Sequence, residues 1–267
     1  MELFVVSIGV LGPGLADWPG SRAILRGDAP YVAQDLELSA PAILSGRERR
    51  RSSATTRLAL NVAQEAVEGS GLPASDLAAV FGSSNGSGLE THLILKALTE
   101  PGMPVSPTQF HNSVHNSAVG YWCIATGCHH ASTSIASHDY TFAAALLKAA
   151  GQVVTEKRPV LLTVSDCPLP APLDAKRRIA GPFALSLVLT PKLSDRALFR
   201  VSLQWRKGGF EEAKIVSPAL IALAELWHGN PAGRALPLLE AFAVGKPATL
   251  SVLYPKTGRL DLGVSPC

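Results

Sequence analysis

A strand that runs straight into a buried helix constrains the fold of this sequence more than any other feature. Ser132–Ala136 is a short β-prone run, and Tyr140–Ala150 is apolar on almost every face. A helix that is apolar all round is buried. The turn between the two segments contains neither glycine nor proline, and it carries His138 and Asp139. This pattern predicts a nucleophile elbow, in which the turn residue sits at the N-terminus of the helix.

The composition indicates a globular α/β protein with an ample core. The chain has 267 residues, of which 47% are hydrophobic and 17% charged, and chains on this apolar side often hide surface against a partner. A net charge of +3 is too mild to indicate a nucleic-acid partner. No run approaches the ~18 apolar residues of a membrane-spanning helix. The four cysteines lack metal or disulfide spacing, which favours reduced thiols in the cytoplasm.

Apolar runs separated by helical segments predict a largely parallel sheet with helices on both faces. The expected strands are residues 3–10, 77–82, 132–136, 159–165 and 183–190, and the last two are joined without an apparent helix. A capping box at Ser45 and Glu48 opens a helix expected to run to about Glu68. Further helices are expected at residues 89–99 and after Ser106, whereas residues 16–42 are expected to form loops.

The last part of the chain holds fewer elements. We expect a strand at residues 198–205, helices at 218–227 and 236–243, and a hairpin of 248–254 with 259–264. The hairpin turn is expected at residues 255–258, where proline and glycine occur.

The residues before the elbow resemble those of β-ketoacyl synthases in the thiolase-like superfamily. The family pattern is N-x-x-A-G, then I-x-x-G, then a strand that ends in A-C-x-x-G. Asn116, Gly120, Ile124 and Gly127 match it, and Val119 stands where the family usually has alanine. The family's Gly-Pro pair before the strand is His-Ala here, at residues 130–131. Laid on the pattern without a gap, the position of the catalytic cysteine holds Asp139.

This resemblance implies a thiolase-like layered fold. Residues 1–191 would form the ketosynthase-like N-terminal half, with a five-stranded, mostly parallel sheet whose fifth strand is antiparallel. Residues 192–267 would form a shortened C-terminal half, because a full ketosynthase repeats the whole five-stranded unit there.

The chemistry of a ketosynthase is not expected from these residues. A thiolate is needed to accept the acyl group, and the histidine motifs H-G-T-G-T and G-H-x-x-G of the family's second half do not occur. A carboxylate attacking a thioester would give an anhydride that water destroys. Asp139 at a helix start is therefore expected to be an ordinary N-cap, and no nucleophile is paired with His138. No catalytic residue and no cofactor is expected.

The resemblance implies instead an inactive subunit, a chain length factor that pairs with an active β-ketoacyl-acyl carrier protein synthase. The shortened second half resembles the subunits of aryl polyene (xanthomonadin-type) type II polyketide systems. One alternative is a self-sufficient small ketosynthase or acyltransferase that uses His138 or Asp139. Another is a purely structural stabiliser of the partner.

Two groups of residues are candidates for contact with partners. In the family, the helical segment before the elbow strand lies at the dimer axis and contributes to the partner's acyl tunnel. Here the candidates are Gln109, Ser113, Val114, Asn116 and Ser117, and the polar ones share one face if the helix is unbroken. The second group is Arg47, Arg49, Arg50 and Arg51, which form either a solvated basic face or a docking patch for an acidic carrier protein.

Two other motifs are expected to have no ligand. His111 and His115 have the spacing of metal ligands on a helix, but the resemblance places this helix against the dimer partner, so no metal is expected. The glycine-rich loop at residues 82–88 lacks the Gly-Lys-Ser/Thr ending of a phosphate loop, so a nucleotide site is not expected.

Overall fold

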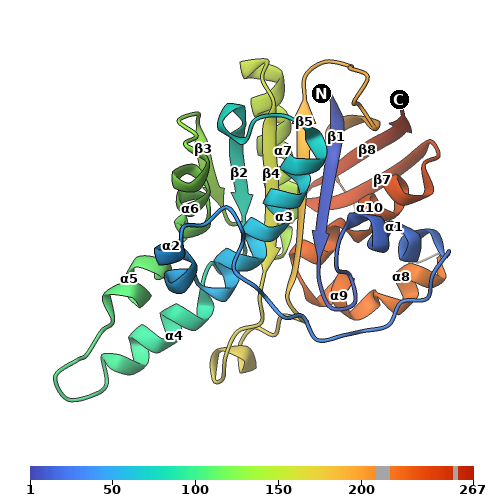
Figure 1. Ribbon diagram of the computed structural model, residues 1–267. Coiled ribbons are helices and arrows are strands. Elements are labelled where there is room, and N and C mark those ends of the chain that lie inside the picture. The colour runs from blue at the N-terminus through green and yellow to red at the C-terminus, as the bar shows by residue number, and fades with distance from the viewer. Residues whose placement is uncertain (209–216, 255–257) are drawn as a thin grey trace.

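A single mixed sheet organises the computed structural model, which describes residues 1–208, 217–254 and 258–267 (Figure 1). Its strand order is β3-β2-β4-β5-β1-β6-β8-β7. The strands are β1 Glu2–Leu11, β2 Ala78–Gly82, β3 Ser132–Ile135, β4 Val160–Asp166, β5 Phe183–Thr190, β6 Phe199–Lys207, β7 Ala248–Tyr254 and β8 Gly258–Pro266. The helices are α1 Trp18–Arg26, α2 Gly46–Arg51, α3 Ala54–Ser70, α4 Gly88–Ala97, α5 Pro107–Ser113, α6 Ser117–Thr126, α7 Thr141–Glu156, α8 Pro218–Ala222, α9 Ala224–Gly229 and α10 Leu236–Val244.

The first five strands have the arrangement expected from the sequence. β2 pairs in parallel with β3 and with β4, whereas β5 lies antiparallel between β4 and β1. Four of these five strands therefore point the same way and only β5 is reversed. Every residue of β4 is buried, as both-face coverage of a central strand requires. The predicted α/β fold class is confirmed.

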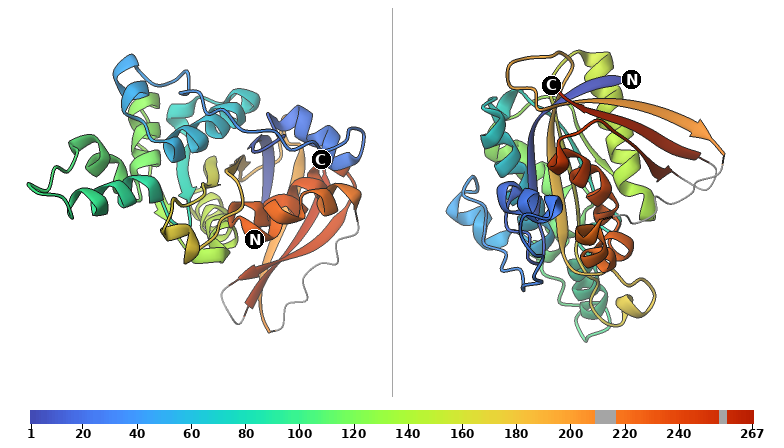
Figure 2. Two further views of the ribbon diagram at one scale, coloured as in Figure 1. Left: turned by 90° about the horizontal axis from the view of Figure 1, so that it is seen from below. Right: turned by 90° about the vertical axis from the view of Figure 1, so that its right-hand side faces the viewer.

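The strand count of the whole sheet exceeds the five that were expected. β6 pairs antiparallel with the free edge of β1, β8 pairs with β6, and β7 pairs with β8. The C-terminal strands thus extend the first sheet instead of starting another one, and Figure 2 shows them (orange to red) fanning out beside the N-terminal strand. The predicted hairpin is present as β7 and β8, while residues 255–257 of its turn lie outside the described residues. The division at residues 191 and 192 stays a prediction.

Helices cover both faces of the sheet. α3 and α6 enclose one cluster of buried apolar side chains, which includes Leu60, Phe81 and Trp122. α7 and α10 enclose the larger cluster on the opposite face, with Phe142 and Phe242 at its centre. The buried helix predicted after the elbow is α7, and its position fixes the elbow at one end of the sheet.

Three helical predictions need correction. Residues 18–26, expected to be loop, form α1, which Asp17 caps by accepting a hydrogen bond from the Gly20 N–H. The helix expected from residue 46 to 68 is two helices, because the backbone is extended at Ser52 and Ser53 and the Ser53 side chain caps α3. The helix expected at residues 218–227 is likewise divided into α8 and α9. Among the described residues, no helix is long and apolar enough to cross a bilayer.

Candidate functional site

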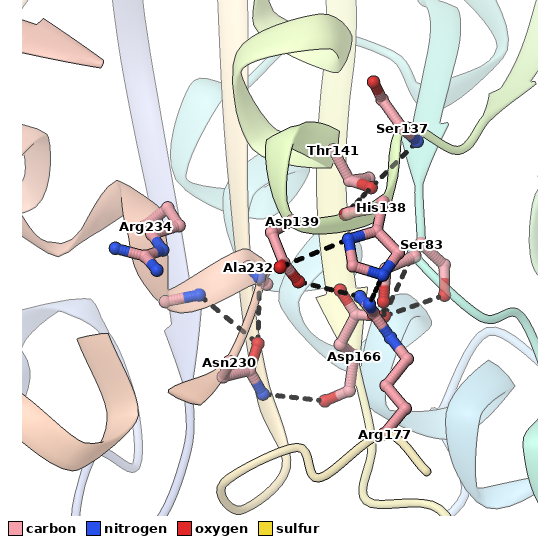
Figure 3. A network of polar contacts seen from close by, with 12 residues as sticks. Ser83, Ser137, His138, Asp139, Thr141, Asp166, Arg177, Asn230, Ala232 and Arg234 are labelled. Atoms are coloured by element: carbon pink, nitrogen blue, oxygen red, sulfur yellow. Dashed lines mark hydrogen bonds and ion pairs between the residues drawn. The ribbon is translucent and has the colours of Figure 1, made fainter. Parts of the chain in front are cut away.

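The elbow is present, and its strain lies at His138. β3 ends at Ile135, and a 3₁₀ turn at His138–Tyr140 leads directly into α7. His138 has a φ of +52°, in the left-handed region that side-chain-bearing residues rarely adopt. The Thr141 hydroxyl donates to the His138 carbonyl oxygen at 2.7 Å and accepts from the Ser137 N–H at 3.0 Å (Figure 3). This side chain therefore holds the sharp turn predicted from the sequence.

The carboxylate of Asp139 is held by a cation from a distant loop. Arg177, between β4 and β5, places its Nη2 atom 2.9 Å from Oδ1 of Asp139. The Nδ1 atom of His138 lies 3.2 Å from Oδ2 of Asp139, and the Arg177 guanidinium also contacts Nε2 of His138. The three side chains form one cluster, in which Arg177 is 17% exposed and Asp139 is 51% exposed.

The expected role of Asp139 as an N-cap is wrong. No side-chain cap bond occurs at the start of the 3₁₀ turn or of α7, and the residues at those positions are Ser137 and Tyr140. The carboxylate faces Arg177 instead, because an ion pair with the guanidinium is available across the elbow.

A buried carboxyl group forms the floor of the site. Asp166, the last residue of β4, accepts hydrogen bonds from the Ser84 N–H at 2.8 Å, the Ser84 hydroxyl at 2.7 Å and the Ser83 hydroxyl at 3.3 Å. Burial raises the pKa of Asp166 to about 6, while the hydrogen bonds and the charge of Arg177 act in the opposite direction. The glycine-rich loop after β2, for which no nucleotide was expected, thus packs around this carboxyl group.

Asn230 connects the C-terminal part of the chain to this floor. Its side chain is fully buried, and its Nδ2 atom donates to the carbonyl oxygens of Asp166 at 3.3 Å and Gly181 at 2.9 Å. Its Oδ1 atom accepts from the Ala232 N–H at 2.8 Å (Figure 3). Sequence reasoning missed Asp166, Arg177 and Asn230. The available signal was that the carboxyl ends of the parallel strands β2, β3 and β4 meet at one edge of the sheet, beside the elbow.

The segment predicted to contact the partner is not one helix. α5 ends at Ser113 and α6 begins at Ser117, with extended backbone at Val114. The Asn112 amide donates to the Arg51 carbonyl oxygen at 2.5 Å and holds the end of α5 against α2. Gln109 and Ser113 therefore do not share a continuous helical face with Asn116 or Ser117, and the condition for that prediction is not met. The metal-ligand spacing of His111 and His115 is lost at the same break.

Exposed apolar side chains gather on the segment that runs from α4 to α6. β3 is the edge strand and α6 packs against it, while α5 contacts α6 and α4 contacts α5 (Figure 1). The exposed apolar residues of this region are Leu89, Leu95, Leu98, Met103, Phe110, Val114 and Ile124. A patch of this kind on a folded chain is typical of a protein–protein interface.

The four arginines of α2 have different environments. Arg49 donates from Nε to the Leu44 carbonyl oxygen at 2.8 Å and from Nη2 to the Ala42 carbonyl oxygen at 2.7 Å, so its side chain holds the preceding loop. Arg47 and Arg51 line a cavity, and Arg50 does not. Among the residues that the structure describes, no group of three or more His, Cys, Asp and Glu side chains is placed to hold a metal ion.

Comparison with known proteins identifies the family. A model of the β-ketoacyl synthase N-terminal domain matches residues 26–218. The chain belongs to this family. A search of curated proteins found no match.

Solved structures of ketosynthase-like proteins share the fold over their full length. One is the ketosynthase ApeO in complex with its chain length factor ApeC from Xenorhabdus doucetiae, with a TM-score of 0.74, 20% identity, and coverage of 98% of this chain and 99% of that one. The ishigamide ketosynthase/chain length factor gives a TM-score of 0.74 at 12% identity, with 99% of both chains covered. The AntDE:AntF complex, a type II polyketide carrier protein with its ketosynthase, gives 0.75 at 11% identity, with 100% of this chain and 99% of that chain covered. The predicted thiolase-like ketosynthase fold is therefore confirmed.

Proposed function

We propose that this chain is a catalytically silent ketosynthase-like subunit, a chain length factor. It pairs with an active β-ketoacyl-acyl carrier protein synthase in the cytoplasm, in a type II polyketide or fatty-acid-type pathway for aryl polyene pigments. The observation that carries the proposal is the ion pair between Asp139 and Arg177, at the position where the family has its cysteine.

The cluster at the elbow leaves no group free to start acyl transfer. A thiolate attacks thioesters readily, whereas the Asp139 carboxylate is paired with a guanidinium. Both ring nitrogens of His138 are engaged, one with Asp139 and the other with Arg177. A general base needs a free nitrogen lone pair. These contacts favour a silent subunit over a self-sufficient enzyme that uses His138 or Asp139.

Acyl labelling tests the catalytic silence. Incubated with acyl-carrier thioesters, this chain should gain no acyl mass, while the ketosynthase subunit of the pair is acylated. Asp139→Ala should leave condensation by the pair intact. Intact-protein mass spectrometry measures both, and an acyl adduct on this chain during productive turnover would contradict the proposal.

The partner covers the apolar edge formed by β3, α4, α5 and α6. The exposed residues there support this assignment, since an obligate interface buries about 2,000 Å² or more and is apolar at its centre. Expressed alone, the chain should self-associate; co-expressed with its ketosynthase, it should form a 1:1 heterodimer in light scattering. A stable monomer that does not bind the ketosynthase would contradict the proposed pairing.

The partner-contact candidates lie along this edge. Ser113, Val114, Asn116 and Ser117 are in or next to the break between α5 and α6, and Gln109 is within α5. We assign them to the interface, where they contribute to the wall of the partner's acyl tunnel. If they only pack against the partner, the chain is a structural stabiliser. The two assignments differ in whether substitutions there alter product length.

The arginines of α2 provide the docking patch for the acyl carrier protein. All four arginines are exposed, and Arg49 is also engaged by main-chain carbonyl groups. Exposed cations of this kind attract acidic proteins and raise the association rate.

A further inference from the structure

Two cysteines meet at the C-terminal end of α6. The helix ends at Thr126, and Gly127 follows with a φ of +65°, in the left-handed region. The N–H groups of Gly127 and Cys128 both donate to the Cys123 carbonyl oxygen, the second at 3.1 Å. These bonds are typical of the Schellman ending of a helix, which frequently brings the side chains at its two ends into contact. In this chain both of those side chains are thiols.

The two thiol groups differ in exposure and in their other partners. Cys128 is buried, and its Sγ atom donates to the Leu77 carbonyl oxygen at 3.2 Å. Cys123 is half-buried, and its thiol interacts with the Cys128 thiol and with the hydroxyl of Ser132 at the start of β3. Burial raises the pKa of Cys123, whereas the hydrogen bond with Ser132 acts in the opposite direction. A small solute can therefore reach Cys123, and Cys128 is held next to it, away from solvent.

The other two cysteines have different surroundings. Cys167 follows Asp166 and interacts with Thr55, and burial raises the pKa of its thiol to about 12. Cys267 is exposed at the end of β8, near Arg200. In the described part of the chain, neither has a second thiol among its interacting groups. Cys123 and Cys128 are thus the pair that can be joined without moving the main chain.

We propose that Cys123 and Cys128 form a reversible disulfide when the chain meets hydrogen peroxide. The Cys123 sulfur loses its proton and attacks one peroxide oxygen; the O–O bond breaks, and the other oxygen leaves as water with that proton. The Cys128 thiol then attacks the sulfenic acid on Cys123, so that the S–S bond forms and the sulfenic hydroxyl leaves as a second water with the Cys128 proton. The two thiols lose two electrons, which reduce one peroxide to two waters.

The turn geometry makes the second step faster than the first. The buried surroundings of Cys123 disfavour its thiolate, which slows attack on the peroxide. Cys128 already contacts the sulfur that becomes oxidised, and residues joined by a main-chain hydrogen bond are as close as a disulfide requires. The sulfenic acid therefore does not accumulate. This inference does not depend on the proposed function.

Peptide mapping of the full chain after peroxide treatment tests the pair. The tryptic peptide of residues 97–148 contains no other cysteine, so the disulfide appears as the loss of two hydrogen atoms from this peptide. We expect this loss in the wild-type chain, together with resistance of both cysteines to alkylation and full reversal by dithiothreitol. Met103 lies in the same peptide and is exposed, and its oxidation adds an oxygen atom, which the mass distinguishes.

Variants separate the roles of the two sulfurs. Cys128→Ser should leave a sulfenic acid on Cys123 that dimedone traps, whereas Cys123→Ser should leave the buried Cys128 reduced. The matched control Cys167→Ser should form the disulfide as the wild type does. Two outcomes in the wild-type chain would overturn the inference: a peptide that carries oxidised Met103 but retains two alkylatable thiols, and a dimedone adduct on Cys123 in place of the disulfide.

Discussion

Arg177 lies between two carboxyl groups of opposite exposure, Asp139 and Asp166. Its Nη2 atom is 2.9 Å from the half-exposed Asp139 carboxylate, and its charge also lowers the pKa of the fully buried Asp166. One cation thus occupies the elbow and stabilises the ionised floor beneath it. The cation that pairs with Asp139, at the position of the missing nucleophile, therefore also affects the titration of Asp166, which is measurable.

The Arg177→Met variant should change the pH dependence of stability. The pKa of Asp166 is about 6 in the folded chain against an ordinary value of 3.8, so the folded chain holds this proton more tightly. The Asp166 contribution to the free energy of unfolding therefore falls as the pH rises from about 4 to about 6 and is level above that. Without the cation the pKa of Asp166 should rise further, and the fall should continue above pH 6. Urea unfolding from pH 4 to pH 8 measures this. Arg178→Met, which removes an exposed ion pair with Glu225, is the control, and a similar profile for the two variants would contradict the prediction.

Glu65 should produce a separate pH-dependent loss of stability. Its carboxyl group accepts hydrogen bonds from the Val10 N–H at 2.9 Å and the Trp18 N–H at 2.5 Å, and burial raises its pKa to about 7 from 4.5. Since the folded chain again binds the proton more tightly, the contribution falls between about pH 4.5 and pH 7. Glu65→Gln should flatten the profile in that window. Unfolding free energies at pH 5 and pH 7.5 test this, with the exposed Glu100→Gln as control. If the unfolding free energy of Glu65→Gln changed with pH as it does in the wild type, the prediction would be contradicted.

Asn230→Ala should destabilise the chain by about 3 kcal/mol. The substitution leaves the buried carbonyl groups of Asp166 and Gly181 and the N–H of Ala232 without this partner, and each unsatisfied buried group costs roughly 1–3 kcal/mol. Chemical unfolding at pH 7 measures the change. Asn61→Ala removes an exposed amide that donates to the Ser39 carbonyl oxygen, and it should cost about 1 kcal/mol or less. Equal losses of stability in Asn230→Ala and Asn61→Ala would contradict this prediction.

Ser113→Phe should shorten the product of the assembled pair. The half-buried Ser113 ends α5 and donates to the Phe110 carbonyl oxygen at 2.8 Å, next to the apolar edge. A larger side chain would fill a tunnel at this place, whereas overpacking without free space typically costs ~1–3 kcal/mol and would weaken assembly. Mass spectrometry of the polyenes gives the product length. An intact pair with unchanged products, in this variant and in Gln109→Trp, would leave only the structural-stabiliser assignment.

The elements that could be predicted are those with a local pattern. The turn at residues 137–139 and the buried helix after it follow from periodicity and from the absence of loop-forming residues, and the first five strands follow from apolar runs. The Arg177–Asp139 ion pair could not be predicted, because 38 residues separate its partners and many other arginines would fit a local rule equally well.

The break between α5 and α6 could not be predicted from the sequence either. Next to the break, Asn112 binds the Arg51 carbonyl oxygen, 61 residues away, and tertiary contacts of this kind routinely override local helical propensity. The C-terminal strands were visible as strands. Their own residues do not specify which strand they pair with. Pairing of β6 with the free edge of β1 depends on the rest of the sheet.

Asn230 has a consequence for the order in which the chain takes shape during synthesis. It follows Asp166 by 64 residues, and translation at about 5–20 residues per second delays its appearance by roughly 3–13 seconds after β4 is complete. Until then the elbow strand, the glycine-rich loop and β4 have emerged, but the carbonyl groups that Asn230 satisfies have no amide to bind. The main chain at Asp166, the floor of the site, is therefore made several seconds before the side chain that binds its carbonyl oxygen.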